Sequence, residues 1–227
     1  NGKWNYDYTW GNVDWLQEYY RNWSTAQEHN ASISGGTEKF TYYMSANYLG
    51  QSGFMRYGTD HNKRYNLTGK ISAQITDYVK VDYSIRYSRT DYDRPSILWN
   101  DFYNNVLRRC RPVRPLKDPN GYYMSDINYI EALQNGGRQN EINDGLSQQV
   151  RITITPLKNW NIIGELNIKT DNNWTHYEHK RVYSHMANDP EKTYVATMTG
   201  PSEDKVYEYA YKSLFLNPNV YTNYDIT

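Results

Sequence analysis

The sequence predicts an all-β fold: an antiparallel transmembrane β-barrel fragment of about seven strands, with long extracellular loops and an incomplete barrel. Two observations predict it. Five segments alternate apolar and polar side chains over nine residues or more, which is the period-two signature of strands. The connections between them alternate between short and long, as do the periplasmic turns and extracellular loops of outer-membrane barrels. The second observation carries more weight, because alternation alone also fits a soluble sandwich.

The composition fits a wall that is apolar on one side only. Aromatic residues make up 16% of the chain, with 25 Tyr against 4 Phe, yet the mean hydropathy is −0.95. The chain is therefore too polar for a large conventional core and too aromatic for disorder. No apolar run approaches the roughly 20 residues of a membrane helix, so any crossing is by strands. The net charge of zero gives no general attraction to nucleic acid.

Seven strands are expected along the chain. In order they span residues 28–34, 39–50, 65–75, 79–88, 149–155, 160–169 and 214–226. The third shows the pattern best, with one face made of Tyr65, Leu67, Gly69, Ile71, Ala73 and Ile75 and the other of Asn66, Thr68, Lys70, Ser72 and Gln74. The sixth breaks the alternation once, at Ile163.

The connections set the orientation. Short turns are expected at residues 35–38, 76–77 and 156–159, and long loops at residues 51–63, 90–144 and 170–206. Aromatic residues near the short turns indicate an interfacial girdle: Phe40, Tyr42, Tyr78 and Trp160. By the convention of such barrels, the short turns face the periplasm and the long loops the exterior. Residues 1–27 then belong to an extracellular loop.

Three short helices are expected in the loop segments. The first spans residues 13–20, where Asp14 is a residue type that caps helix N-termini. The others, at residues 97–107 and 126–133, lie in the longest loop, and Gly136-Gly137 closes the second. A loop of this length is typical of functional segments or of segments ordered by a partner.

The alternation also predicts which side chains meet lipid. They occupy every second position of the strands, with no charge in phase. The expected lipid face consists of Ala31, Ile33, Tyr42, Met44, Leu67, Ile71, Val81, Ile85, Val150, Ile152, Ile162 and Leu166.

The residues themselves predict no enzyme, no cofactor and no metal site. His176-Tyr177-Glu178-His179, with His185 nearby, is the one cluster that resembles metal ligands, and in a loop such a stretch is more often solvated. The basic run at 108–114 is short, and packing on carboxylates or on a partner explains it better than nucleic acid. Cys110 is alone, which excludes an intrachain disulfide. No phosphate loop, nucleophile elbow or glycosidase pair stands out.

Aromatic residues in or beside the long loops are the candidate ligand-binding residues. Sugars present flat C–H faces that stack on aromatic rings, and their hydroxyls need polar partners. The candidates are Tyr92, Trp99, Tyr103, Trp174 and Tyr177. Packing within the loops is the alternative for each of them.

Several stretches resemble one family, the SusC/RagA-type TonB-dependent transporters of Bacteroidetes outer membranes. In chain order they are Asp14-Trp15 with Glu18 and Arg21, then residues 29–39, 42–45, 48–53, 64–67, 118–122 and 216–221. The resemblance covers nearly the whole chain. It lacks the family's N-terminal plug, its TonB-contacting segment and most barrel strands. Residues 1–227 are therefore expected to be a partial barrel domain of a larger exported protein.

The resemblance implies a large plugged barrel of about 22 strands that imports glycans or peptides across the outer membrane. It also implies partners: outer-membrane lipid, a SusD-like lipoprotein that lids the extracellular side, and TonB, reached through the absent N-terminal region. One alternative of another class stays open, a soluble secreted all-β carbohydrate-binding module. The two differ in what the apolar face meets, which is lipid in the first and a protein core in the second.

Overall fold

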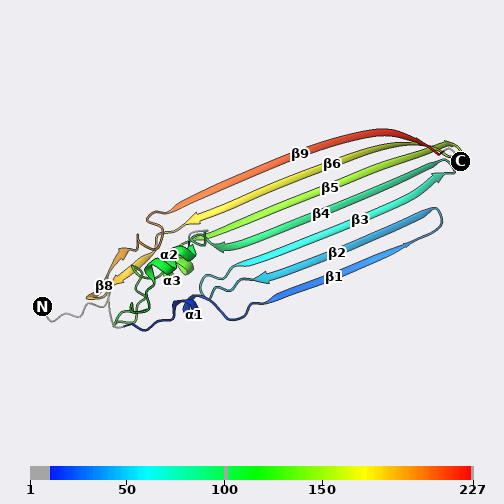
Figure 1. Ribbon diagram of the computed structural model, residues 1–227. Helices are drawn as coiled ribbons and strands as arrows, with labels where there is room; N and C mark the ends of the chain where they lie inside the picture. Colours follow the sequence, from blue (N-terminus) through cyan, green and yellow to red (C-terminus); the bar gives the residue numbers. More distant parts are fainter. Residues whose placement is uncertain (1–10, 100–101, 226–227) are drawn as a thin grey trace.

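A computed structural model describes residues 11–99 and 102–225 as one curved antiparallel sheet with loops gathered at one end (Figure 1). The seven strands of the sheet are β1 (Ala26–Gly36), β2 (Phe40–Ser52), β3 (His61–Thr76), β4 (Val79–Pro95), β5 (Arg138–Leu157), β6 (Trp160–His179) and β9 (Lys205–Tyr224). Each strand pairs with the next of this series, and β1 and β9 are the two edges. The sheet is open, as expected for part of a barrel wall.

The short turns all lie at the end of the sheet opposite the helices (Figure 1). The first of them depends on Gly36, whose φ is +156° and whose added Cβ would lie 2.2 Å from the Phe40 carbonyl oxygen. Only glycine fits so close an approach at this φ. The sequence prediction of three tight turns at this end is confirmed.

The strands are longer than predicted, always at the loop end. β3 begins at His61, β4 continues to Pro95, β5 begins at Arg138, β6 continues to His179 and β9 begins at Lys205. The connecting loops shrink accordingly, to residues 53–60, 96–137 and 180–204. The predicted bounds of 51–63, 90–144 and 170–206 were wrong because the apolar alternation stops before the hydrogen-bond ladder does.

The predicted lipid face forms one continuous surface. Ile33 pairs with Met44, Met44 with Gly69 and Gly69 with Ile85, and directly paired residues point to the same side of a sheet. The same register places all twelve predicted residues on this side, here called the outer face. Ile33 and Met44 are each 59% exposed, so no second sheet covers the face in the part of the chain described. The soluble-module alternative needs such a cover.

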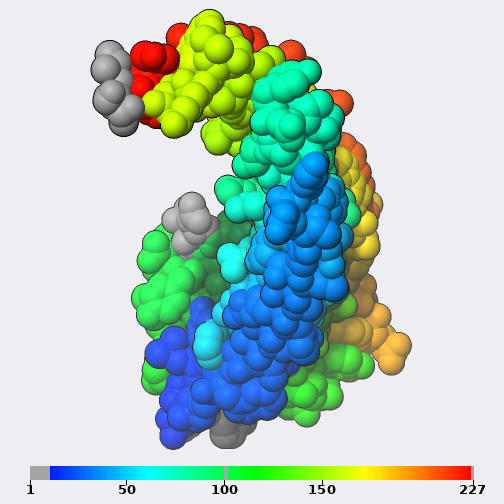
Figure 2. All heavy atoms as spheres, turned by 90° about the vertical axis from the view of Figure 1, so that its right-hand side faces the viewer, coloured from blue at the N-terminus to red at the C-terminus, as the bar shows by residue number. Residues whose placement is uncertain are grey.

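The opposite, polar side of the sheet is concave. Viewed from the short-turn end, the sheet forms an arc, and the described part of the segment between β4 and β5 lies on its hollow side (Figure 2). Contacts agree, because the polar-side residue Tyr177 donates a hydrogen bond to the Ser96 carbonyl oxygen in that segment at 3.1 Å. A concave polar side is the lumen side of a barrel wall, and it is called the lumen face below.

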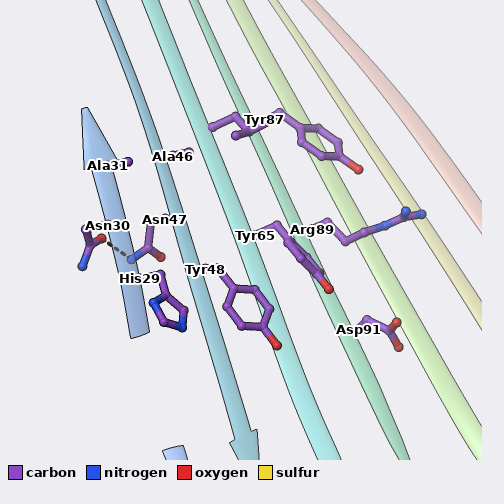
Figure 3. Close-up of a pocket in the computed structure, with 11 residues that line it drawn as sticks. His29, Asn30, Ala31, Ala46, Asn47, Tyr48, Tyr65, Tyr87, Arg89 and Asp91 are labelled. Carbon is purple, nitrogen blue, oxygen red and sulfur yellow. Dashed lines mark hydrogen bonds between the residues drawn. The ribbon is translucent and has the colours of Figure 1, made fainter. Parts of the chain in front are cut away.

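Aromatic rings border the apolar band of the outer face at both ends. Toward the short turns lie Phe40 and Trp160, as predicted. A second border was not predicted. Tyr48 and Tyr65 lie side by side with ring centroids 5.1 Å apart, and they line a groove of about 550 Å³ that also contains Arg89 (Figure 3).

Beyond this second border the outer face carries ion pairs. The Arg89 guanidinium lies 2.9 Å from the Asp144 carboxylate, and Arg138 lies 2.7 Å from Asp93. Charges on both faces erase the period-two signal, although the strands go on pairing. The apolar band of the outer face thus covers only part of the strand length, and the strands extend beyond it on the loop side.

The buried core of the chain lies in the loops. Its members are Trp15, Tyr19, Met55, Ile97, Phe102, Val106, Cys110, Met124, Ile127, Tyr129, Ile130, Ala132, Leu133, Val182 and Ala196, and none of them belongs to the main sheet. The segments 11–25, 53–60, 96–137 and 180–204 that surround this core are called the loop cap. The loops are therefore a small packed unit of their own.

The segment before β1 is held in the cap by hydrogen bonds. The Tyr19 side chain is fully buried, and its hydroxyl accepts a hydrogen bond from the Tyr129 backbone N–H at 2.7 Å. The Trp15 indole N–H donates to the Arg111 carbonyl oxygen at 2.9 Å. These bonds join parts of the chain about a hundred residues apart, so each part needs the other in order to pack.

The cap contains the three helices. Helix α1 (Trp15–Tyr19) has the predicted cap, since the Asp14 carboxylate accepts hydrogen bonds from Leu16 N and Gln17 N. Helices α2 (Phe102–Arg109) and α3 (Ile130–Asn135) begin four or five residues later than predicted. The hairpin of β7 (Tyr183–Met186) and β8 (Asp189–Val195) was not predicted. Across the described residues, no helix is both long and apolar enough to cross a membrane.

A charged residue on the outer face should destabilise the sheet in its membrane. In the full-length protein, Ile71→Arg should cost roughly 2–4 kcal/mol if it lies near the bilayer midplane. Ser45→Arg is the matched control, because it places the same side chain on the lumen face of the neighbouring strand. Urea unfolding from lipid vesicles measures both. Equal costs at the two positions would contradict the assignment of faces.

The cap should unfold separately from the wall. Leu133 is 1% exposed in the cap core, so Leu133→Ala should cost about 2–5 kcal/mol of cap stability. Leu107→Ala, at a side chain 55% exposed, should change it by about 0.5 kcal/mol or less. Hydrogen exchange of the inserted transporter should show faster exchange across 96–137 for the first variant only, with β3 and β4 unchanged. Exchange that rises equally in the strands would show that cap and wall are one cooperative unit.

Candidate functional site

The five predicted ligand-binding rings are divided among three surfaces. Tyr92 on β4 and Tyr177 on β6 belong to the lumen face, next to the cap. Trp99 and Tyr103 lie in the cap itself. Trp174 shares a face with Ile162 on the same strand, which is the outer face, and it stacks on His176 with ring centroids 5.9 Å apart. The structure therefore brings four of the five to the lumen side or the cap and separates Trp174 from them.

The lumen face is tied to the cap at its upper end. Arg94 donates hydrogen bonds to the Leu98 carbonyl oxygen at 2.8 Å and to the Glu141 carboxylate at 2.9 Å. The same guanidinium lies 5.4 Å from the centroid of the Tyr92 ring. Because Arg94 connects β4, β5 and the first residues of the cap, it fixes where the cap sits over the wall.

A column of aromatic residues on β9 is absent from the predicted ligand-binding residues. Tyr207, Tyr209, Tyr211 and Phe215 occupy alternate positions of the lumen face. The upper end joins the Tyr177 ring, whose centroid lies 5.9 Å from that of Tyr207. The last strand was predicted to begin at residue 214, so these three tyrosines were not assigned to a strand. Their period-two spacing in the printed sequence was the available signal.

Helix α2 and Trp99, three residues before its start, present an apolar stripe to solvent. Phe102 and Val106 face the cap core, whereas Trp99, Tyr103 and Leu107, spaced four residues apart, are 56%, 49% and 55% exposed. These last three are called the α2 stripe. Trp99 and Tyr103 are among the predicted ligand-binding residues, whereas Leu107 is not, because only aromatic side chains were considered for ligand binding.

The lumen face near the short turns is basic. A hollow of about 730 Å³ is lined by Lys70, Lys80, Arg86 and Arg151, together with Asp82. Lys80 lies 3.2 Å from Asp82, and Arg151 pairs with Glu165. Lysine and arginine still outnumber the carboxylates, so this part of the wall suits an acidic or hydrogen-bonding neighbour.

The histidines that resembled metal ligands are dispersed. His176 lies on the outer face and pairs with Glu208. His179 lies on the lumen face beside Tyr177, with ring centroids 4.6 Å apart. His185 belongs to β7 and stacks on Tyr122 at 3.8 Å. In the ranges that the structure describes, no group of three potential metal ligands occurs.

Cys110 serves packing. Its sulfur lies 3.6 Å from the Tyr19 hydroxyl oxygen and donates to the Ile127 carbonyl oxygen at 3.3 Å. Burial raises the pKa of the Cys110 thiol to about 11, so it is protonated at neutral pH. A buried, protonated thiol is a poor nucleophile.

No protein-family model matches the chain. Among curated proteins, the chain is 26% identical over 117 residues to TonB-dependent receptor P26 of Formosa agariphila, which covers 51% of this chain and 11% of that receptor. Among solved structures, the RagAB peptide importer in its closed-closed state matches over 100% of this chain with a TM-score of 0.71 and 17% identity. The chain therefore has the fold of part of the RagAB importer, in agreement with the SusC/RagA resemblance of its sequence.

Two further RagAB structures share this fold. The RagAB peptide transporter matches over 99% of this chain with a TM-score of 0.59, and the open-open state matches over 98% with a TM-score of 0.55. Their sequence identities of 16% and 15% show the fold alone. The chain spans between a quarter and a third of the matched RagAB chains. The outer-membrane location expected from the sequence agrees with this fold.

Proposed function

We propose that this segment forms part of the wall and extracellular loops of a TonB-dependent importer of oligosaccharides or peptides, working with a SusD-like lipoprotein. In this proposal the outer face meets lipid, and TonB acts through parts of the transporter outside these residues. The segment carries out no bond chemistry. Its relatives are named as a receptor and an importer, which supports transport over catalysis.

The α2 stripe carries the proposal. Phe102 and Val106 of α2 are buried in the cap core, whereas the three large side chains of the stripe stay exposed on one side of the same segment. Apolar patches with a polar rim mark interaction surfaces, and here the exposed residues Asn104, Arg108 and Arg111 supply the rim. Tryptophan, tyrosine and arginine are also the residue types that dominate binding energy at interfaces.

The position of the stripe favours the lipoprotein as the partner. α2 lies at the loop end of the sheet, far from the short turns (Figure 1), which is the extracellular end in the predicted orientation. The resemblance to SusC/RagA transporters implies a lipoprotein that covers this end. Trp99 and Tyr103, proposed first as ligand-binding residues, would then bind the lid, with ligand captured beneath it.

Removing the stripe should uncouple the lipoprotein from the barrel. In the whole transporter, a variant with Trp99→Ser, Tyr103→Ser and Leu107→Ser should bind the lipoprotein at least about tenfold more weakly, because interface hot spots contribute about 2 kcal/mol or more each. Co-purification and nutrient uptake should both fall. The barrel should still fold, since no strand is altered. Its shift in mobility on SDS gels between unheated and heated samples should therefore stay unchanged.

Asn105→Ala is the matched control, because it lies on the same helix outside the stripe and its rim. It should leave co-purification and uptake as in the unsubstituted protein. Normal lipoprotein binding by the triple variant would refute the proposed docking surface.

A further inference from the structure

We infer that the lumen-facing tyrosines of β9, Tyr207, Tyr209 and Tyr211, form a binding track for a linear, uncharged oligosaccharide. This inference rests on the proposed function, since it names the substrate class and the wall residues that an importer would use. The track lies on the lumen face below the cap, away from the α2 stripe. It is therefore a separate surface that can be tested separately.

The geometry of the strand spaces the rings regularly. Alternate residues of a β-strand lie about 6.7 Å apart on one face, so the three rings form a ladder with a repeat comparable to the length of a sugar ring. Tyr209 and Tyr211 are 61% and 50% exposed. Each ring therefore has a free surface, and successive sugar units of one chain can rest on successive rings.

The residues beside the column supply hydrogen-bonding groups. On β6, Thr175 is paired with Tyr209 and Asn173 with Tyr211, so a polar side chain flanks each ring on the lumen face. Within the described residues, no hydrogen bond engages the Tyr209 or Tyr211 hydroxyl. Flat rings for the C–H faces, bordered by amide and hydroxyl groups, are what a carbohydrate needs.

The charges favour an uncharged sugar over a peptide. The three lumen-facing positions from Tyr207 to Tyr211 carry no ionisable group other than the phenols themselves. Two ion pairs lie near the ends of the track, Lys205 with Glu203 beside Tyr207 and Lys169 with Asp171 at 3.0 Å below Tyr211, so these charges already have partners. A peptide brings charged termini and side chains that would find no partner along this column, whereas a neutral sugar brings only hydroxyls.

The upper end of the track is fixed in place. The Tyr207 ring packs against Tyr177 at 5.9 Å and against His179 at 6.1 Å, and Tyr177 is bonded to the cap through Ser96. Rings held in this way need little reordering when a ligand binds, which favours affinity. A sugar chain entering beneath the cap would meet Tyr207 first and Tyr211 last.

The test uses the purified whole transporter with its lipoprotein and two probe sets. One set contains neutral hexasaccharides, namely malto-, cello-, xylo- and laminarihexaose, and the other is a tryptic peptide digest of casein. Calorimetry should show that at least one hexasaccharide binds. The variant Tyr209→Leu with Tyr211→Leu should weaken that binding roughly tenfold, because each stacked ring contributes about 0.5–1.5 kcal/mol. Tyr209→Phe with Tyr211→Phe keeps the rings and should retain most of the affinity.

Tyr65→Leu, on the outer face, is the matched control and should bind as the unsubstituted protein does. Unchanged sugar binding after loss of both rings would overturn the inference, and so would binding of the casein peptides with no hexasaccharide bound. Either result leaves the proposed importer standing, because lipoprotein coupling is tested at the α2 stripe.

Discussion

One continuous hydrogen-bond ladder across seven strands governs the rest of the structure. Because every strand pairs in sequence order, each side chain is assigned to one of two faces by position alone. The apolar side chains therefore gather on the outer face and the polar ones on the lumen face. The same ladder continues past the apolar band, so Arg138, Asp93 and their neighbours extend the wall beyond the membrane and support the cap.

Much of the wall was predictable, and the reason is physical. Where one face meets lipid, a charge such as that of Arg89 is costly, so the sequence between Leu67 and Ile75 must alternate. Above the tyrosine border neither face imposes that constraint, and the strand ends at His61 and Pro95 could not be located from polarity. The same uncertainty affected the predicted ligand-binding residue Trp174. It was assigned to a loop, although it lies in a strand and on the outer face.

The cap could not be predicted because its contacts are distant in sequence. Tyr19 packs against Tyr129 and Cys110, a separation that no local pattern reveals. Short helices such as α1 and α3 are marginal alone and depend on this packing. The result combines a rigid wall with a separately packed cap, and the exposed α2 stripe and β9 tyrosines are the surfaces that this arrangement leaves available.

The central claim, that the sheet crosses the outer membrane with its cap outside, is tested most directly by labelling intact cells. In the whole transporter, Lys192→Cys on β8 and Glu38→Cys in the first short turn would each be exposed to a large, membrane-impermeant maleimide. We predict that the cysteine at position 192 is labelled on intact cells, and the one at position 38 only after the outer membrane is opened. Labelling at 38 but not at 192 on intact cells would contradict the account.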